Sequence, residues 1–155
     1  MHSEVELLLH CAQTRVDAEQ SKRIRGLLKE NIDWRYLTRM AHLHGLAPLL
    51  YRNLNATCPD AVPKESLDQL RDLFSEAKVR NFFLTGELLA LLSLFETHRI
   101  AAIPFKGPVL AARAYGDLSL RLFLDLDILI HKQDFLRAKT LLISQGYQPE
   151  LTDAQ

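Results

Sequence analysis

The chain has 155 residues, of which 48% are hydrophobic and 25% are charged, with 6 Gly and 6 Pro. This composition excludes disordered and collagen-like chains, and the length suits one domain or one small domain with an extension. The 19 basic and 19 acidic side chains balance, and neither the part before residue 98 nor the part after it is strongly basic, which argues against nucleic acid as a partner.

The first 98 residues predict a series of helices, separated by Gly, Pro or Asn and without strand patterns. Three helices are each preceded by a capping residue, and two of the caps have a Glu or Gln three residues later that completes a capping box. These residues are Ser3 with Glu6, Asp17 with Gln20, and Asp33. The third helix ends at Gly45, which suits a left-handed residue, and a short fourth helix covers residues 48–54.

Pro63 opens the longest predicted element, either one helix or two joined near Gly86. Its apolar residues alternate between spacings of three and four, which predicts a stripe that faces other helices. The stripe consists of Leu67, Leu70, Phe74, Ala77, Leu84, Leu88, Leu91 and Phe95. Only Asn81 interrupts it. Because the pattern is short for a coiled coil, a stripe buried within one chain is favoured over a dimeric one.

From residue 99 the pattern changes to strand, helix, strand, helix. Residues 100–105 predict a short buried strand, and a helix follows from Pro108. Residues 122–130 (LFLDLDILI) predict a second strand, and residues 132–145 an amphipathic helix closed by Gly146. We therefore expect an α+β fold with two parts: a helical subdomain over residues 1–98, and a partial sheet with flanking helices over residues 99–155.

Two acidic residues lie inside the most hydrophobic run of this second part. Asp125 and Asp127 would share one face of a strand, where like charges repel unless a cation lies between them. Mg²⁺ is the natural partner, because it is held by one or two carboxylates together with substrate phosphates. The simpler alternative is that both side chains reach solvent.

Residues that suit a phosphate precede the acid pair, as we call Asp125 and Asp127. The first strand runs into Lys106, Gly107 and Pro108 at a helix start, where free backbone N–H groups favour an anion. Arg121, four residues before Asp125, adds a second cation.

Six segments carry a resemblance to a known family. They are residues 44–54 (HGLAPLLYRNL), 105–110 (FKGPVL), 114–117 (AYGD), 120–121 (LR), 125–130 (DLDILI) and 138–147 (AKTLLISQGY). Together they resemble the polymerase-beta-like nucleotidyltransferases, and within them the uncharacterised bacterial group called nucleotidyltransferase family 5. The resemblance extends over roughly residues 5–148.

The resemblance implies roles for six residues. Asp125 and Asp127 would bind one or two Mg²⁺ ions, while Lys106, Gly107, Pro108 and Arg121 would bind the nucleotide. The implied reaction is Mg²⁺-dependent transfer of a nucleoside monophosphate from an NTP to an unknown acceptor hydroxyl.

A third carboxylate, from a later strand, commonly completes such sites. Glu150 and Asp153 are the acids that follow the last predicted helix, and neither suits this role. Family members are usually about twice as long, so we expect this chain to be the N-terminal portion or a truncated form of such a protein.

Two alternatives to the enzyme stay open. One is an inactive nucleotidyltransferase-like domain that binds a partner protein or associates with itself through exposed apolar surface. The other is an all-helical scaffold without a nucleotide site. In each case the sequence predicts a protein without a membrane partner, because no apolar stretch approaches the length of a membrane span. It also predicts a cytoplasmic location, because Cys11 and Cys58 lack a partner motif, as is typical of a reducing compartment.

Overall fold

The computed structural model describes residues 2–149, which form seven α-helices and two strands in these residues. In chain order the elements are α1 (Ser3–Cys11), α2 (Ala18–Leu27), α3 (Trp34–Leu43), α4 (Ala47–Thr57), α5 (Lys64–Thr97), β1 (Ala102–Phe105), α6 (Gly107–Leu110), β2 (Asp127–Ile130) and α7 (Phe135–Ser144). A π-helical turn, Ala111–Tyr115, extends α6, and 3-10 turns at Pro59–Ala61 and Lys132–Asp134 precede α5 and α7. The predicted α+β class is confirmed, and the sheet excludes the all-helical alternative.

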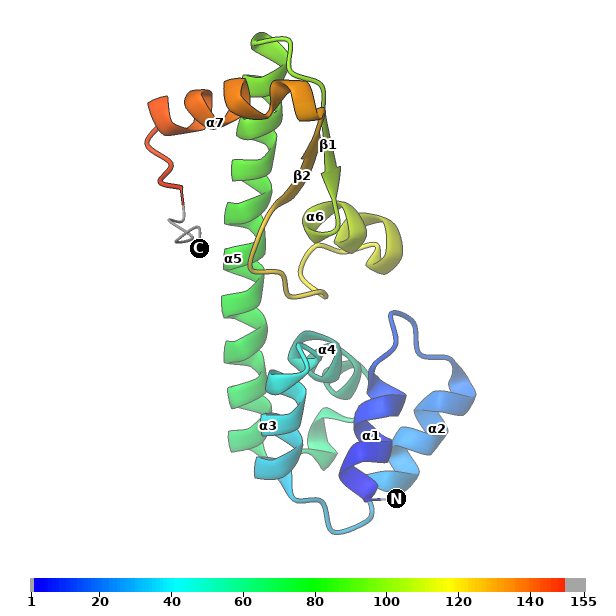
Figure 1. Ribbon diagram of the computed structural model, residues 1–155. Helices are drawn as coiled ribbons and strands as arrows, with labels where there is room; N and C mark the ends of the chain where they lie inside the picture. The colour runs from blue at the N-terminus through cyan, green and yellow to red at the C-terminus, as the bar shows by residue number, and fades with distance from the viewer. Residues whose placement is uncertain (1, 150–155) are drawn as a thin grey trace.

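Helix α5 runs along the whole molecule, with α1 to α4 beside one half and β1, β2, α6 and α7 beside the other (Figure 1). Each half has its own apolar cluster. The larger cluster joins α1 to α4 to the start of α5 and includes Leu50 and Leu70. The smaller one joins the end of α5 to the sheet and α7 through Phe95, Ile100 and Ala138. One helix therefore supplies residues to both clusters.

Local capping signals explain most of the helix starts. The Asp17 carboxylate accepts a hydrogen bond of 2.8 Å from the Gln20 backbone N–H, and the Gln20 side chain accepts one from the Asp17 N–H, so the predicted capping box is confirmed. Asp33 caps α3 in the same way, by accepting from the Tyr36 N–H. Gly45, at φ +67°, ends α3 as predicted.

The predicted cap at Ser3 is wrong. His2 occupies the capping position of α1 without a side-chain bond, and Ser3 is already inside the helix. The Ser3 hydroxyl donates instead to the carboxylate of Glu30, which lies after α2. A partner distant in the sequence has replaced the local one.

Helix α5 is continuous over 34 residues and has no break at Gly86. A glycine inside a helix costs only about 1 kcal/mol, which the buried residues on either side of it offset. These include Ala77, Leu88 and Leu91. Asn81 is fully buried within this stripe.

The two strands pair antiparallel, and the pairing sets their length. Phe105 pairs with Asp127, and Ala102 pairs with Ile130 at the other end. The second strand, predicted from residue 122, begins only at Asp127, because β1 ends at Phe105 and leaves no partner for the earlier residues. Residues 122–126 are therefore an unpaired segment that leads into β2.

The predicted helix from Pro108 forms as α6 with its π-helical turn and ends at Gly116. Residues 132–145 form a 3-10 turn followed by α7, and Gly146 follows with φ +94°. Among residues 2–149, no helix combines the length and the apolar character needed to cross a membrane.

The two cysteines differ in burial, which leads to a testable difference in reactivity. Cys11 is completely buried in the larger cluster, and this burial raises its pKa to about 12, whereas Cys58 is half-buried. At about pH 8 we expect a disulfide reagent to modify Cys58 quickly and Cys11 only after unfolding, because the thiolate is the reactive form. Rapid modification of two thiols in the folded protein would contradict this.

Candidate active site

The turn between β1 and α6 has an unusual backbone. Lys106 and Gly107, which we call the glycine turn, both have positive φ angles, +55° and +38°. Such a conformation is strained for a lysine, and strained residues cluster at functional sites. The Lys106 carbonyl accepts a hydrogen bond from the Leu110 N–H, which ties the turn to the first turn of α6. Pro108 is buried behind it.

The glycine turn lies against the acid pair. A Cβ atom on Gly107 would be 3.5 Å from the backbone oxygen of Asp125, so this backbone passes close to the segment before β2. The Lys106 ammonium lies 3.9 Å from the Asp127 carboxylate. Phe105, the last residue of β1, pairs with Asp127, the first residue of β2, so Lys106 and the residues just before β2 lie at the same edge of the sheet. Four of the six predicted residues therefore come together.

The polar groups of this site are open to solvent. Asp125 is exposed, and the side chains of Lys106 and Asp127 are 56% and 40% exposed. An ion pair this exposed contributes about 1 kcal/mol or less. Lys106 can therefore leave Asp127 to bind another anion, such as a phosphate, at little cost.

Strand alternation places Asp127 on the outer face of the sheet. Leu129 and its partner Ile103 share this face and are 57% and 65% exposed. Ile128 and Ile130 point the other way and pack in the smaller apolar cluster. The apolar residues that flank Asp127 thus fix the strand, while its carboxylate stays on the open face.

Arg121 is not brought into direct contact with the other predicted residues. Among residues 2–149, no hydrogen bond or ion pair joins its side chain to the acid pair or to the glycine turn. Its Nη1 atom is buried and has no hydrogen-bond partner in this part of the chain. Its backbone oxygen accepts a bond of 2.9 Å from Asn81.

The segment before the acid pair contains contacts that the sequence motifs did not reveal. The Asp117 carboxylate accepts bonds of 2.8 Å from the Ser119 N–H and 2.7 Å from the Ser119 hydroxyl. Partial burial acts to raise the pKa of Asp117, but the bonds from Ser119, with the charges of Arg52 and Lys78, outweigh it and lower the pKa. Asn81 also contacts this segment, through the backbone oxygens of Leu118 and Arg121. The sequence showed Asn81 as the break in the apolar stripe, but it did not show these partners.

The acid pair supplies the kind of ligand that Mg²⁺ prefers. Carboxylate oxygens are hard ligands, and Mg²⁺ sites often contain only one or two of them, with water and phosphate completing the shell. In residues 2–149 no cluster of three or more His, Cys, Asp or Glu side chains is placed to hold a metal ion. Glu150 and Asp153, considered above for the third carboxylate, lie outside the described residues. Two carboxylates alone would leave most of a Mg²⁺ coordination shell to water and phosphate.

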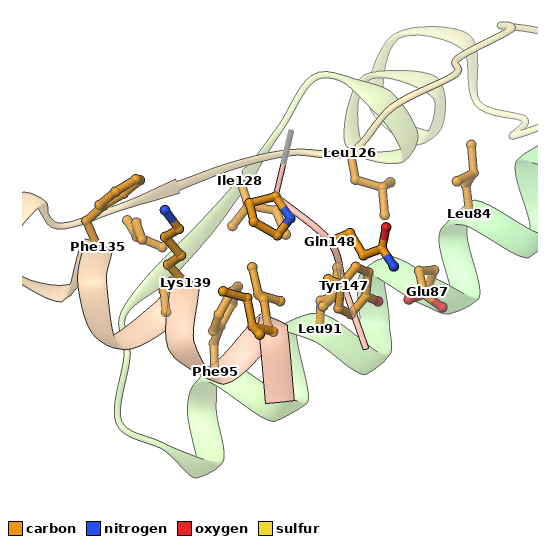
Figure 2. Close-up of a pocket in the computed structure, with 15 residues that line it drawn as sticks. Leu84, Glu87, Leu91, Phe95, Leu126, Ile128, Phe135, Lys139, Tyr147 and Gln148 are labelled. Carbon is orange, nitrogen blue, oxygen red and sulfur yellow. The ribbon is translucent and has the colours of Figure 1, made fainter. Parts of the chain in front are cut away.

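A separate apolar groove of about 720 Å³ lies on the inner side of β2, between α5 and α7. Figure 2 shows Leu91 from α5, Ile128 from β2 and Phe135 from α7 around it. Glu87 and Lys139 add one charge of each sign. None of the six predicted site residues lines this groove, so it is distinct from the candidate active site.

Comparison with protein-family models finds one described as "Uncharacterised nucleotidyltransferase", which matches residues 30–155. The match includes both strands, the glycine turn and the acid pair, and it confirms the resemblance inferred from the sequence motifs. No curated protein and no solved structure matches the chain.

Gly107 offers a test of the local geometry. Replacing Gly107 with Ala should destabilise the fold by about 1 kcal/mol, because an L-residue is strained at this positive φ. Gly86→Ala is the control, since Gly86 is helical, has open space around it, and should gain roughly 1 kcal/mol from helix propensity. Urea unfolding measures the free energy of unfolding of both variants. If Gly107→Ala changes it in the same direction and by the same amount as Gly86→Ala, the turn is not strained.

Proposed function

Because the chain belongs to the uncharacterised nucleotidyltransferase family, we propose that it transfers a nucleoside monophosphate from an NTP to an acceptor hydroxyl with the help of Mg²⁺. The observation that carries this proposal is the contact between the glycine turn and the acid pair. A cation, a close backbone turn at a helix start and two carboxylates lie within one small region.

Each of these groups has a role in the proposed reaction. Asp125 and Asp127 would hold Mg²⁺, which supplies charge neutralisation for the triphosphate. The Lys106 ammonium would move from Asp127 to a phosphate oxygen, and Gly107, which has no side chain, lets the segment before β2 lie close to the turn. Pro108 donates no N–H and would shape the turn instead. Arg121 would add charge from the segment before the acid pair.

The proposed reaction is a displacement at phosphorus. The acceptor oxygen forms a bond to the α-phosphorus, the bond from that phosphorus to the bridging oxygen breaks, and pyrophosphate leaves while the hydroxyl loses its proton. The balanced net charge argues against a nucleic acid as the acceptor. A protein or a small molecule with a free hydroxyl is therefore proposed, and an NTP substrate suits a cytoplasmic location.

Calorimetric titration of ATP in the presence and absence of Mg²⁺ tests this proposal. The wild-type chain should bind ATP only with the metal, and the double variant Asp125→Asn, Asp127→Asn should lose this binding because its amides cannot replace two charged ligands. The other NTPs are titrated in the same way.

The matched control for that titration is Asp60→Asn with Asp72→Asn, which removes two exposed acids from the other end of the molecule. It should bind as the wild type does. Binding that survives in the acid-pair variant, or no binding of any NTP to the folded wild type, would contradict the proposed function.

A second candidate function is an inactive domain that associates through its apolar surface, and the groove between α5, β2 and α7 favours it. Phe135 lines the groove and is 57% exposed. If copies of the chain associate here, Phe135→Glu should abolish concentration-dependent assembly in light scattering. Leu9→Glu, at a position 55% exposed on α1, should leave it unchanged. A monomer at all concentrations would exclude self-association.

A further inference from the structure

A buried asparagine lies in the middle of α5. Asn81 has none of its surface exposed, and the nearest buried residues before and after it in α5, Ala77 and Leu88, are apolar. A leucine here would continue the stripe, whereas an amide must find hydrogen-bond partners to be buried without loss. The amide therefore calls for an explanation beyond the packing of α5.

Both partners of the Asn81 amide nitrogen belong to the segment before the acid pair. Nδ2 donates to the backbone oxygen of Leu118 at 2.6 Å and to that of Arg121 at 2.9 Å. Between these two carbonyls lie Ser119 and Leu120, which are both buried. One side chain from α5 thus fixes two backbone groups of this segment.

The residues that follow this segment lack regular backbone hydrogen bonding. Residues 122–126 are neither helical nor paired with β1, so no ladder of backbone hydrogen bonds orients them before β2 begins. Asp125 is only four residues after Arg121, a span of at most about 14 Å. The last backbone group that Asn81 fixes is therefore close to the first residue of the acid pair.

The side-chain hydrogen bonds of Asn81 are made by its donor alone. Its Oδ1 atom is buried and has no partner among residues 2–149. An unpaired buried acceptor opposes folding. The residue therefore supplies two donors to one segment while its own acceptor stays unsatisfied.

We propose that Asn81 is a positioning residue of the candidate active site. It holds the backbone from Leu118 to Arg121 against α5, so that the acid pair meets the glycine turn. The effect on nucleotide binding rests on the proposed function, whereas the effect on the position of the acid pair does not.

Asn53 offers a matched control with the same hydrogen-bond chemistry. It is 5% exposed on α4, and its Nδ2 donates to the backbone oxygens of Cys11 at 2.7 Å and Gln13 at 2.9 Å. These partners belong to the end of α1 and the residues after it, and none is part of the candidate site. A loss of stability that follows simply from removing a buried amide should therefore be similar when Asn53 is replaced.

The test compares Asn81→Leu with Asn53→Leu by amide NMR of the ¹⁵N-labelled chain. With Asn81→Leu, the signals of Gly107, Asp125 and Asp127 should move, because the acid pair is no longer held against the turn. With Asn53→Leu they should stay in place. Urea unfolding of both variants separates this local effect from a general loss of stability. Unchanged signals in Asn81→Leu would overturn the proposal.

Calorimetry with Mg²⁺ and ATP adds a second readout. Asn81→Leu should weaken binding about tenfold or more, and Asn53→Leu should not. If the wild type binds no nucleotide but the NMR signals move as expected, the proposed function fails and the role of Asn81 stands. If the wild type binds ATP, and Asn81→Leu binds it equally well with unmoved NMR signals, the proposed function stands and the proposed role of Asn81 fails. If Asn81→Leu does not fold, the NMR and calorimetry measurements are repeated with Asn81→Ser, which keeps one hydrogen-bond donor.

Discussion

The continuous helix α5 is the constraint on which the rest of the structure depends. Its first half packs against α3 and α4, and its second half supports the sheet and α7 (Figure 1). Each of the two apolar clusters takes one of its walls from this helix. A break in α5 would therefore remove part of both clusters at once. The buried residues on either side of Gly86 keep the helix continuous at this glycine.

The candidate active site combines a strained backbone turn with exposed charged side chains. The turn before α6 is fixed by its unusual dihedral angles and by contact with the segment before β2. The side chains that it presents are long, exposed and weakly paired. Such an arrangement suits a polyanionic ligand, because the backbone defines where phosphates can approach while lysine and carboxylates adjust to them.

Local signals in the sequence were sufficient where the interacting groups are neighbours. The caps at Asp17 and Asp33 act within three residues, and the left-handed stop at Gly45 needs only its own backbone, so all three were predicted correctly. Ser3 was predicted wrongly because its partner, Glu30, lies 27 residues away. The start of β2 was wrong for a related reason, since a strand can extend only as far as its partner strand.

The same distinction applies to the site. The sequence motifs identified the acid pair and the glycine turn as candidates, but their contact depends on the pairing of Phe105 with Asp127, which no local pattern contains. Asn81 stood out as a polar residue in an apolar stripe. Its partners, 37 and 40 residues further along the chain, could not be inferred from that stripe.

The size of the sheet has a consequence for how the molecule opens. Within residues 2–149 the sheet contains two strands of four residues each, and a ribbon this small is marginal without support from neighbouring elements. The helical half, by contrast, encloses the larger cluster. Thermal fluctuations should therefore separate β1 from β2 far more often than they unfold α1 to α4. The candidate site lies in the part of the protein that loses its order first, where a ligand gains most by holding the two strands together.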